Sequence, residues 1–423
     1  MSKALGMRCV WGIGGVLGGV MALASVAQAE VTTDVSGSLL VYPKVIFDGV
    51  VGPNARDTVI QLSNTSNNMV HAHCFYVNGA SAFPGGPPLW QITDFTIWLT
   101  KQQPTHWVAS TGRQVNPADS FGSNGFGLDP GLIPPVPPGF TGELKCVQID
   151  ASGTPFGGNN LKGEATLRAV DGDVSKYNAI AILATDLAGD FPANELLLNN
   201  TDVNDGEYNA CPEVLLLDHF ADGTFNGIGG GNAVGSFRNA DNIVSSLNPA
   251  ACFGNDCPIR TSLTLVPCTQ DFENAQPSIV TVQFSIVTEL EQIFSASTSV
   301  QCWRDFRLTD VDALSGRCTQ DPSVSCVVDE QCIAGDDGFC DKTSVFSVGV
   351  AGTRSLLTRV TPVDPFGGVL GVLEESVYNN IDDGGDQLTK VARASWIPQK
   401  QGFRFNPELH ATDAVTIPIF TGF

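Results

Sequence analysis

Basic residues, long apolar runs and catalytic signatures are all scarce in this chain of 423 residues. Lysine and arginine total 22 against 44 aspartates and glutamates, which gives a formal net charge of −22. Phosphate binding needs basic patches, so duplex nucleic acid is excluded as an expected partner. After Val26 no stretch contains the ~18 consecutive apolar residues of a membrane-spanning helix. The chain is therefore not expected to span a membrane.

No catalytic motif with a known mechanism occurs in the sequence. No serine lies in G-x-S-x-G, and neither H-E-x-x-H nor the phosphate-binding G-x-x-x-x-G-K is present. Carboxylate pairs such as Glu374–Glu375 are common on solvated strand edges, and acid–base catalysis needs a cleft that a sequence does not reveal. We therefore predict a protein without catalytic activity. A secreted hydrolase that uses acidic residues is one alternative.

The N-terminus has the organisation of a secretory signal peptide. Lys3 and Arg8 form a basic start, an apolar run at 9–26 follows, and Ala-Gln-Ala at 27–29 fits the small-x-small cleavage rule. We predict that residues 1–29 are removed. The mature protein is then exported to the periplasm, the cell surface or the exterior of a bacterium.

Period-two alternation of apolar and polar residues dominates the chain, and helical periodicity is nearly absent. Thr58 to Ser63 and Met69 to Val77 are predicted strands, and the polar turn between them predicts a hairpin. Gly142 to Asp150 and Gly163 to Val170 are predicted to form another hairpin. About seven such strands with turn signals between them are typical of a two-sheet sandwich.

The order of motifs from Leu39 to about Val170 resembles the immunoglobulin-like domains of secreted bacterial surface proteins. It lacks the Cys…Trp…Cys frame of true immunoglobulin domains. A second strand-dense block follows Asp256. We predict an all-β fold of two immunoglobulin-like antiparallel β-sandwich domains with long loops and a small disulfide-stapled insert. The predicted domains are 30–200 and 201–423, with the insert at 318–340.

Eleven of the twelve cysteines remain once Cys9 leaves with the signal peptide, and export favours disulfides. An odd number means that at least one thiol is free or bridges to another chain. Cys74 and Cys146 fall on strands that would be neighbours in the sandwich, so they are predicted to pair. The other predicted pairs outside the insert are Cys252 with Cys257 and Cys268 with Cys302, which leaves Cys211 as the odd thiol.

The insert contains Cys318, Cys326, Cys332 and Cys340 in the spacing C-x7-C-x5-C-x7-C. Zinc ribbons need two-residue gaps between thiolates, and no CxxC occurs in the chain. The spacing therefore favours a loop held by disulfides over a metal site.

Two groups of residues are candidate metal ligands. His71 and His73 alternate on one predicted strand, so their imidazoles share a face, and His106 could add a third nitrogen. The alternative interpretation is that they lie at the surface or the edge of the core. A second candidate is structural Ca²⁺ in an acidic turn that contains Asp382, Asp383 and Asp386, although Asp-Gly clusters are also ordinary turns. No other cofactor is predicted.

Trp90, Trp98 and Trp107 fall within eighteen residues. Exposed on one sheet face they would form a carbohydrate platform, whereas buried between sheets they are core, which the usual burial of aromatic side chains favours.

The function that these observations predict is that of a non-catalytic structural or interaction protein of the bacterial envelope or exterior. Its partners would be other envelope or extracellular proteins, or further copies of itself. Assembly could use strand addition, with Ala414–Phe423 or Val31–Phe47 completing a neighbour's sheet. The alternative is an extracellular carbohydrate- or metal-binding module that uses the tryptophans or the histidines.

Overall fold

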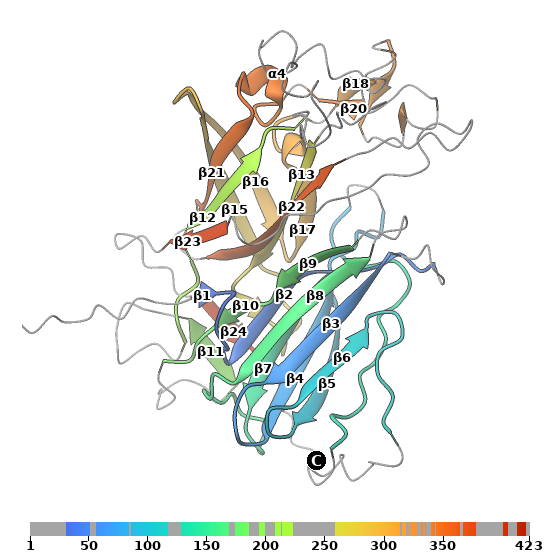
Figure 1. The fold of residues 1–423 in the computed structure, drawn as a ribbon, viewed down its shortest axis with the longest axis vertical. Helices are drawn as coiled ribbons and strands as arrows, with labels where there is room; N and C mark the ends of the chain where they lie inside the picture. The colour runs from blue at the N-terminus through green and yellow to red at the C-terminus, as the bar shows by residue number, and fades with distance from the viewer. Residues whose placement is uncertain are drawn as a thin grey trace, which may run out of the picture.

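Nearly every element in the computed structural model is a β-strand (Figure 1). Among the elements that the structure describes, the exceptions are a 3-10 turn, η3 (Leu308–Asp310), and one helical turn, α4 (Val348–Ala351). The structure describes residues 31–50, 56–83, 86–116, 128–168, 174–185, 194–198, 208–222, 259–377, 401–404 and 413–419, with short gaps inside 208–222 and 259–377. Among these residues no helix has the length and apolar character needed to cross a membrane.

Two antiparallel sheets pack face to face in the N-terminal half of the described chain. The six-stranded sheet has the order β1 (Val31–Thr32), β10 (Ile180–Ile182), β2 (Leu39–Phe47), β7 (Phe140–Ile149), β4 (Val70–Asn78) and β5 (Gln91–Leu99). The four-stranded sheet has the order β6 (Pro104–Val108), β3 (Asp57–Asn64), β8 (Leu161–Arg168) and β9 (Val174–Asn178). A first core cluster that includes Tyr42, Ile60, Tyr76 and Trp107 fills the space between them.

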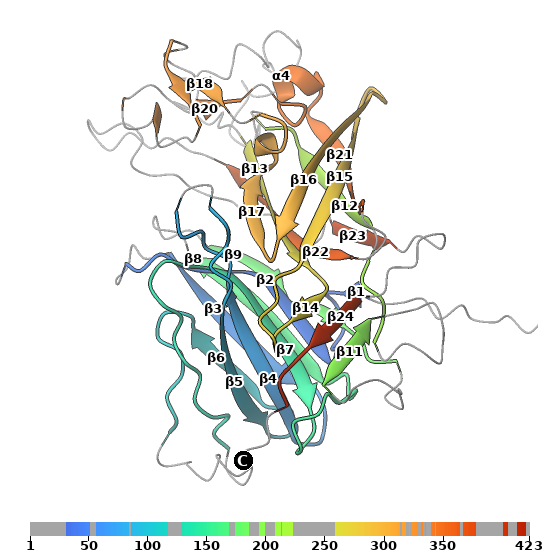
Figure 2. The ribbon, with the colours of Figure 1, turned by 180° about the vertical axis from the view of Figure 1, so that it is seen from behind.

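The central strands of the six-stranded sheet are buried on both faces, which is why β4 contains no exposed residue. Along β2, Leu40 and Tyr42 belong to the first core, whereas Leu39 and Val41 point to the opposite face. That face is covered by a small sheet of β11 (Glu195–Leu198), β24 (Asp413–Thr416) and β14 (Gln270–Asp271), visible in Figure 2. β14 pairs with β24 in parallel. Val415 of β24, the last described strand, belongs to the same core cluster as Leu39 and Val41 of β2, so this strand packs against the six-stranded sheet.

The second half contains another pair of sheets around a second core. The five-stranded sheet has the order β16 (Ile293–Gln301), β15 (Ile279–Thr288), β21 (Ser355–Pro362), β12 (Val214–Phe220) and β23 (Gln401–Arg404). The three-stranded sheet consists of β17 (Arg304–Arg307), β13 (Ile259–Pro267) and β22 (Val369–Val377). Phe284, Phe306 and Phe346 meet edge-on in the core. The insert has a three-stranded sheet of its own, β18 (Gly316–Cys318), β19 (Ser325–Cys326) and β20 (Cys340–Asp341).

The prediction of an all-β fold with antiparallel sheets is confirmed. The two predicted N-terminal hairpins are wrong, because β3 and β4 lie in different sheets, as do β7 and β8. In both cases the chain crosses from one sheet to the other over the first core. The polar turn after β3 is stabilised where the Asn64 side chain donates hydrogen bonds to the carbonyl groups of Asn68 and Thr100 at 2.6 and 2.9 Å.

A bulge in β2 joins the two halves of the chain. The register of β2 with β7 shifts between Tyr42 and Val45, which takes Pro43 and Lys44 out of the ladder. Lys44 Nζ lies 3.0 Å from Asp305 Oδ2 and 2.9 Å from Glu374 Oε2. These two salt bridges connect β2 of the first half to β17 and β22 of the second half.

Candidate functional site

Several buried polar side chains lie together between the six-stranded sheet and β14. Glu143 and Lys145 point from β7 toward this layer, with exposed fractions of 0% and 1%, and Gln270 from β14 is 1% exposed. Their neighbours on the same face of the sheet include Val77, Val147 and Phe272. Two ionisable groups and a carboxamide are thus enclosed in an apolar layer, where unpaired charge is costly. We call Glu143, Lys145 and Gln270 the β7–β14 cluster.

The three side chains of the β7–β14 cluster contact one another directly. Lys145 Nζ contacts Gln270 Oε1, donates a hydrogen bond of 3.2 Å to the carbonyl oxygen of Pro267, and lies 3.5 Å from Glu143 Oε2. Gln270 Nε2 donates to Glu143 Oε1. The Lys145 amine also lies 5.8 Å from the centre of the Phe272 ring.

Burial shifts both ionisable groups of the cluster toward their neutral forms. It raises the pKa of Glu143, and the nearby Lys145 and Gln270 only partly oppose this shift. Burial likewise lowers the pKa of Lys145, although Glu143 opposes the change. Moving one proton from the ammonium to the carboxylate removes both charges, which a low-dielectric environment favours. Burial therefore shifts the Lys145 amine and the Glu143 carboxyl group toward their neutral forms, beside the carboxamide of Gln270.

Asp413 of β24 lies close to this cluster, beside a disulfide. It accepts hydrogen bonds from Thr269 Oγ1 at 2.6 Å and from the Gly368 amide at 2.9 Å, and burial raises its pKa. Cys211 and Cys268 have sulfur atoms near the carboxylate, but they are bonded to each other. Because cysteine binds a metal ion as the thiolate, and both sulfur atoms are in a disulfide, this trio is not a metal site in the oxidised protein.

The cysteine pairing differs from the prediction at one disulfide. Cys74 joins Cys146 directly across β4 and β7, as predicted. The predicted Cys268–Cys302 bond is wrong, because Cys268 is bonded to Cys211, and the described cysteine that stays free is Cys302. The reason is that Cys268 follows β13 into the small β14 sheet, where its amide bonds to Gly368 O beside Cys211. The predicted Cys252–Cys257 pair lies outside the described residues.

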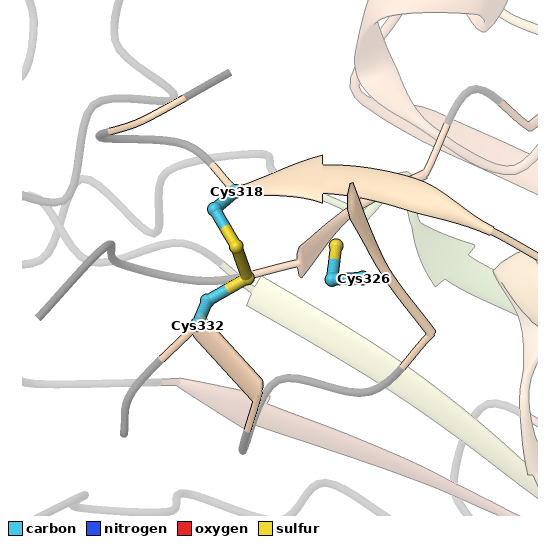
Figure 3. Close-up of side chains that lie close together, drawn as sticks. All are labelled: Cys318, Cys326 and Cys332. Atoms are coloured by element: carbon cyan, nitrogen blue, oxygen red, sulfur yellow. A yellow bond between two sulfur atoms is a disulfide. The ribbon is translucent and has the colours of Figure 1, made fainter. Parts of the chain in front are cut away.

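The insert is held by two crossed disulfides, Cys318–Cys332 and Cys326–Cys340. Figure 3 shows the first of these bonds, with the Cys326 sulfur close by. Cys318, Cys326 and Cys332 have sulfur atoms within 4.8 Å of one another, the separation that a metal site would require. In the oxidised protein all of these sulfur atoms are in disulfides, as the spacing indicates.

The structure brings the predicted histidine ligands only partly together. His71 and His73 both lie on β4 and are 2% and 0% exposed, whereas His106 is exposed on β6 in the other sheet. His71 stacks on Trp98 with ring centroids 3.8 Å apart, and His73 Nε2 lies 3.0 Å from Asp94 Oδ2. Over the described ranges, no group of three potential ligand atoms within 4.8 Å includes a histidine. The acidic turn with Asp382, Asp383 and Asp386 lies outside the described residues.

The three clustered tryptophans do not share one face. Trp107 is 2% exposed in the first core, where its Nε1 donates to Tyr76 Oη. Trp90 stacks near Phe272 on the opposite side of the six-stranded sheet, with ring centroids 6.4 Å apart. Trp98 packs on His71. The arrangement supports the core interpretation for Trp107 and does not form a single carbohydrate platform.

The β7–β14 cluster is not predictable from the strand pattern, because its residues resemble a solvated strand face. In the segment GELKCVQID, Glu143 and Lys145 alternate with Leu144 and Cys146, and the usual inference places such charges in water. The one available signal was that Val147 and Ile149 continue the same face with apolar side chains.

Within the described residues, one edge strand has no neighbour on its outer side over most of its length. β16 ends the five-stranded sheet, and its nine residues contain neither a charge nor a proline. In an antiparallel pair, the backbone groups of every second residue form hydrogen bonds to the neighbouring strand. Just after β16, the amide of Cys302 donates a hydrogen bond of 2.8 Å to the carbonyl oxygen of Ser278. By the register of the two strands, the even-numbered residues of β16 are therefore the ones that bond to β15. The backbone groups of Ile293, Ser295 and Ser297 therefore point away from β15. The carbonyl group of Ser299 accepts a 2.8 Å hydrogen bond from Arg304.

Comparison with known proteins adds no functional assignment, since neither a protein-family model nor a curated protein matches the chain.

Proposed function

We propose that the chain is an exported, non-catalytic structural protein whose two immunoglobulin-like β-sandwiches assemble with a second copy through the edge of β16. The observation that carries this proposal is the row of outward backbone groups at Ile293, Ser295 and Ser297, for which the described residues supply no partner. An uncharged edge of this kind is a template for strand addition.

An exposed apolar row next to this edge supports the proposal. Ile293 on β16 is opposite Val287 on β15, and Val287 is opposite Leu357 on β21. The side chain of Ile293 is 70% exposed and that of Leu357 is 45% exposed. Leu290, in the turn between β15 and β16, is 66% exposed. A large apolar group beside an open edge is characteristic of an interaction surface. Antiparallel pairing of β16 with its own copy would place the two rows side by side around a two-fold axis.

Export is supported by the disulfides. Four of them occur among the described residues, and such bonds persist in oxidising compartments outside the cytosol. The uncharged β16 also suits association of two acidic chains, because pairing there brings no like charges directly opposite each other.

Light scattering coupled to size exclusion tests the assembly on the mature, oxidised protein. The wild type is expected to be a dimer. Ser297→Pro removes an outward N–H group without touching a hydrogen bond to β15, so this variant should be a folded monomer. Ser297→Thr keeps the N–H group and is the matched control that should remain dimeric. A monomeric wild type, or a Ser297→Pro variant that dimerises normally, would contradict assembly at this edge.

The two segments first considered as strand donors are already paired within the chain. β2, inside Val31–Phe47, lies between β10 and β7, and β24, which overlaps the start of Ala414–Phe423, lies between β11 and β14. The proposal therefore uses β16 as the pairing strand in their place.

A further inference from the structure

We propose that the β7–β14 cluster forms an intramolecular isopeptide bond between the side chains of Lys145 and Gln270, with Glu143 transferring the protons. The bond would join positions that are 125 residues apart, and it does not depend on assembly at β16.

The three side chains that would react are already in contact, with the Lys145 amine against the carboxamide oxygen of Gln270. Lys145 Nζ touches the carboxamide group of Gln270, and that carboxamide touches the carboxyl group of Glu143. All three side chains are at most 1% exposed, so water is largely excluded as a competing nucleophile. Holding an amine against a carbonyl group in this way replaces an encounter in solution with a reaction inside one molecule.

The environment also shifts both ionisable groups toward the protonation states that the reaction needs. An amine is nucleophilic only when neutral, and burial lowers the pKa of Lys145. A carboxyl group can donate a proton to a leaving nitrogen only when it is protonated, and burial raises the pKa of Glu143. Glu143 Oε2 has no hydrogen-bond partner among the described atoms, which leaves it available for the proton released by Lys145.

The reaction balances without any other reagent. The Lys145 nitrogen attacks Cδ of Gln270, and a new C–N bond forms. Glu143 gives its proton to the carboxamide nitrogen, the original C–N bond breaks, and ammonia leaves. The attacking nitrogen then returns a proton to Glu143. One amine and one primary amide become one secondary amide and one ammonia, and no atom is oxidised or reduced.

Two other buried groups serve as internal comparisons. Lys44 is also buried, but Asp305 and Glu374 outweigh the effect of burial and raise its pKa, so it stays an ammonium ion. Cys302 lies near Gln270, whose Nε2 is 3.4 Å from the Cys302 carbonyl oxygen. Burial raises the pKa of the Cys302 thiol to about 12, so the thiolate that would form a thioester is disfavoured.

Mass spectrometry of the full chain tests the bond. The reduced and denatured wild type should weigh less than its sequence by one ammonia molecule. Proteolysis should release a branched peptide that contains both Lys145 and Gln270. A mass equal to that of the sequence, or two linear peptides, would overturn the proposal. Two linear peptides with Gln270 converted to glutamate would mean simple deamidation, which overturns it as well.

Variants separate the roles of the three residues. Lys145→Arg removes the nucleophile and Glu143→Gln removes the proton carrier, so each purified variant should have the full mass of its sequence. Lys44→Arg keeps a cation at the other buried lysine and should retain the loss of ammonia. A cross-link that survives in Lys145→Arg would contradict the assignment. The wild-type mass decides the main proposal even where a variant fails to fold.

Discussion

The indole Nε1 of Trp303 donates a hydrogen bond of 2.7 Å to the carbonyl oxygen of Pro43, which lies 260 positions earlier in the chain. This carbonyl group is available because Pro43 lies in the bulge where β2 loses its register with β7. The Trp303 side chain also packs on Gly79, at the end of β4, where an added Cβ would lie 2.6 Å from the ring. One side chain therefore connects the second pair of sheets to two strands of the first.

Replacing Trp303 should uncouple the two halves of the chain. We expect Trp303→Ala to lower the free energy of unfolding by about 3–5 kcal/mol, the usual cost of removing a large buried aromatic side chain. Trp303→Phe keeps most of the packing and loses the donor to Pro43, so it should cost about 1–2 kcal/mol. Urea unfolding measures both values. Equal costs for the two variants would show that ring packing is not the main contribution.

Gly79→Ala should be destabilising for a related reason. The new methyl group would meet the Trp303 ring, so the ring or the strand must move, at a cost of about 1–3 kcal/mol. In a Trp303→Ala background the space is empty and most of this cost should disappear. A double-mutant cycle of unfolding free energies measures the coupling. Additive effects of the two substitutions would contradict the contact.

The strands were predictable from the sequence, but their pairing was not. Alternation in Thr58 to Ser63 and Met69 to Val77 located β3 and β4 within about two residues, because each strand has an apolar face toward the first core. The same polar turn can close a hairpin or carry the chain to a second sheet. What decides is that β4 pairs with the following strand β5 and with β7, and the contact with β7 is distant in sequence.

The buried site was harder to predict for the same reason. Whether Glu143 and Lys145 face water depends on β14 and β24, which come more than 100 residues later and cover that face. Gln270 lies in a strand of only two residues, too short to show any periodicity. The Cys74–Cys146 bond was predictable because it joins directly opposite residues of two long strands.

Mild acid should destabilise the protein through His71. Burial lowers the pKa of His71 from 6.5 to about 4. As the pH falls, the imidazole of His71 therefore binds a proton at a higher pH in the unfolded chain than in the folded chain. The free energy of unfolding decreases as the pH drops from 6.5 to 4, and below pH 4 this contribution no longer changes. The loss is at most about 3 kcal/mol. The charged or titratable neighbours are His73 and Asp150, and Asp150 has a lowered pKa that titrates below this window.

The variant His71→Phe isolates this effect. A phenyl ring can still stack on Trp98, but it binds no proton. Unfolding free energies at pH 7 and pH 4.5 should therefore differ less for His71→Phe than for the wild type, measured by urea unfolding at each pH. Identical pH dependence in the two proteins would assign the acid sensitivity to other groups.

The disulfides of the insert should stabilise it locally, unlike the Cys74–Cys146 bond. The insert's own core consists of its four cysteines and Val324, so it has little apolar surface to hold it once the bonds are removed. Each bond closes a loop with a sequence separation of 14, for which about 3 kcal/mol is expected. Replacing all four cysteines by serine should open this segment to proteases while the main unfolding transition stays unchanged.

The Cys74→Ser/Cys146→Ser variant is the matched comparison, because this bond lies inside the first core and spans 72 positions. Its removal should lower the main unfolding transition by about 4 kcal/mol and leave the insert resistant to proteases. Limited proteolysis and thermal unfolding of the two variants distinguish the sites. If loss of the insert's bonds lowered the main transition as much, the insert would be part of the second core and not a separately stabilised segment.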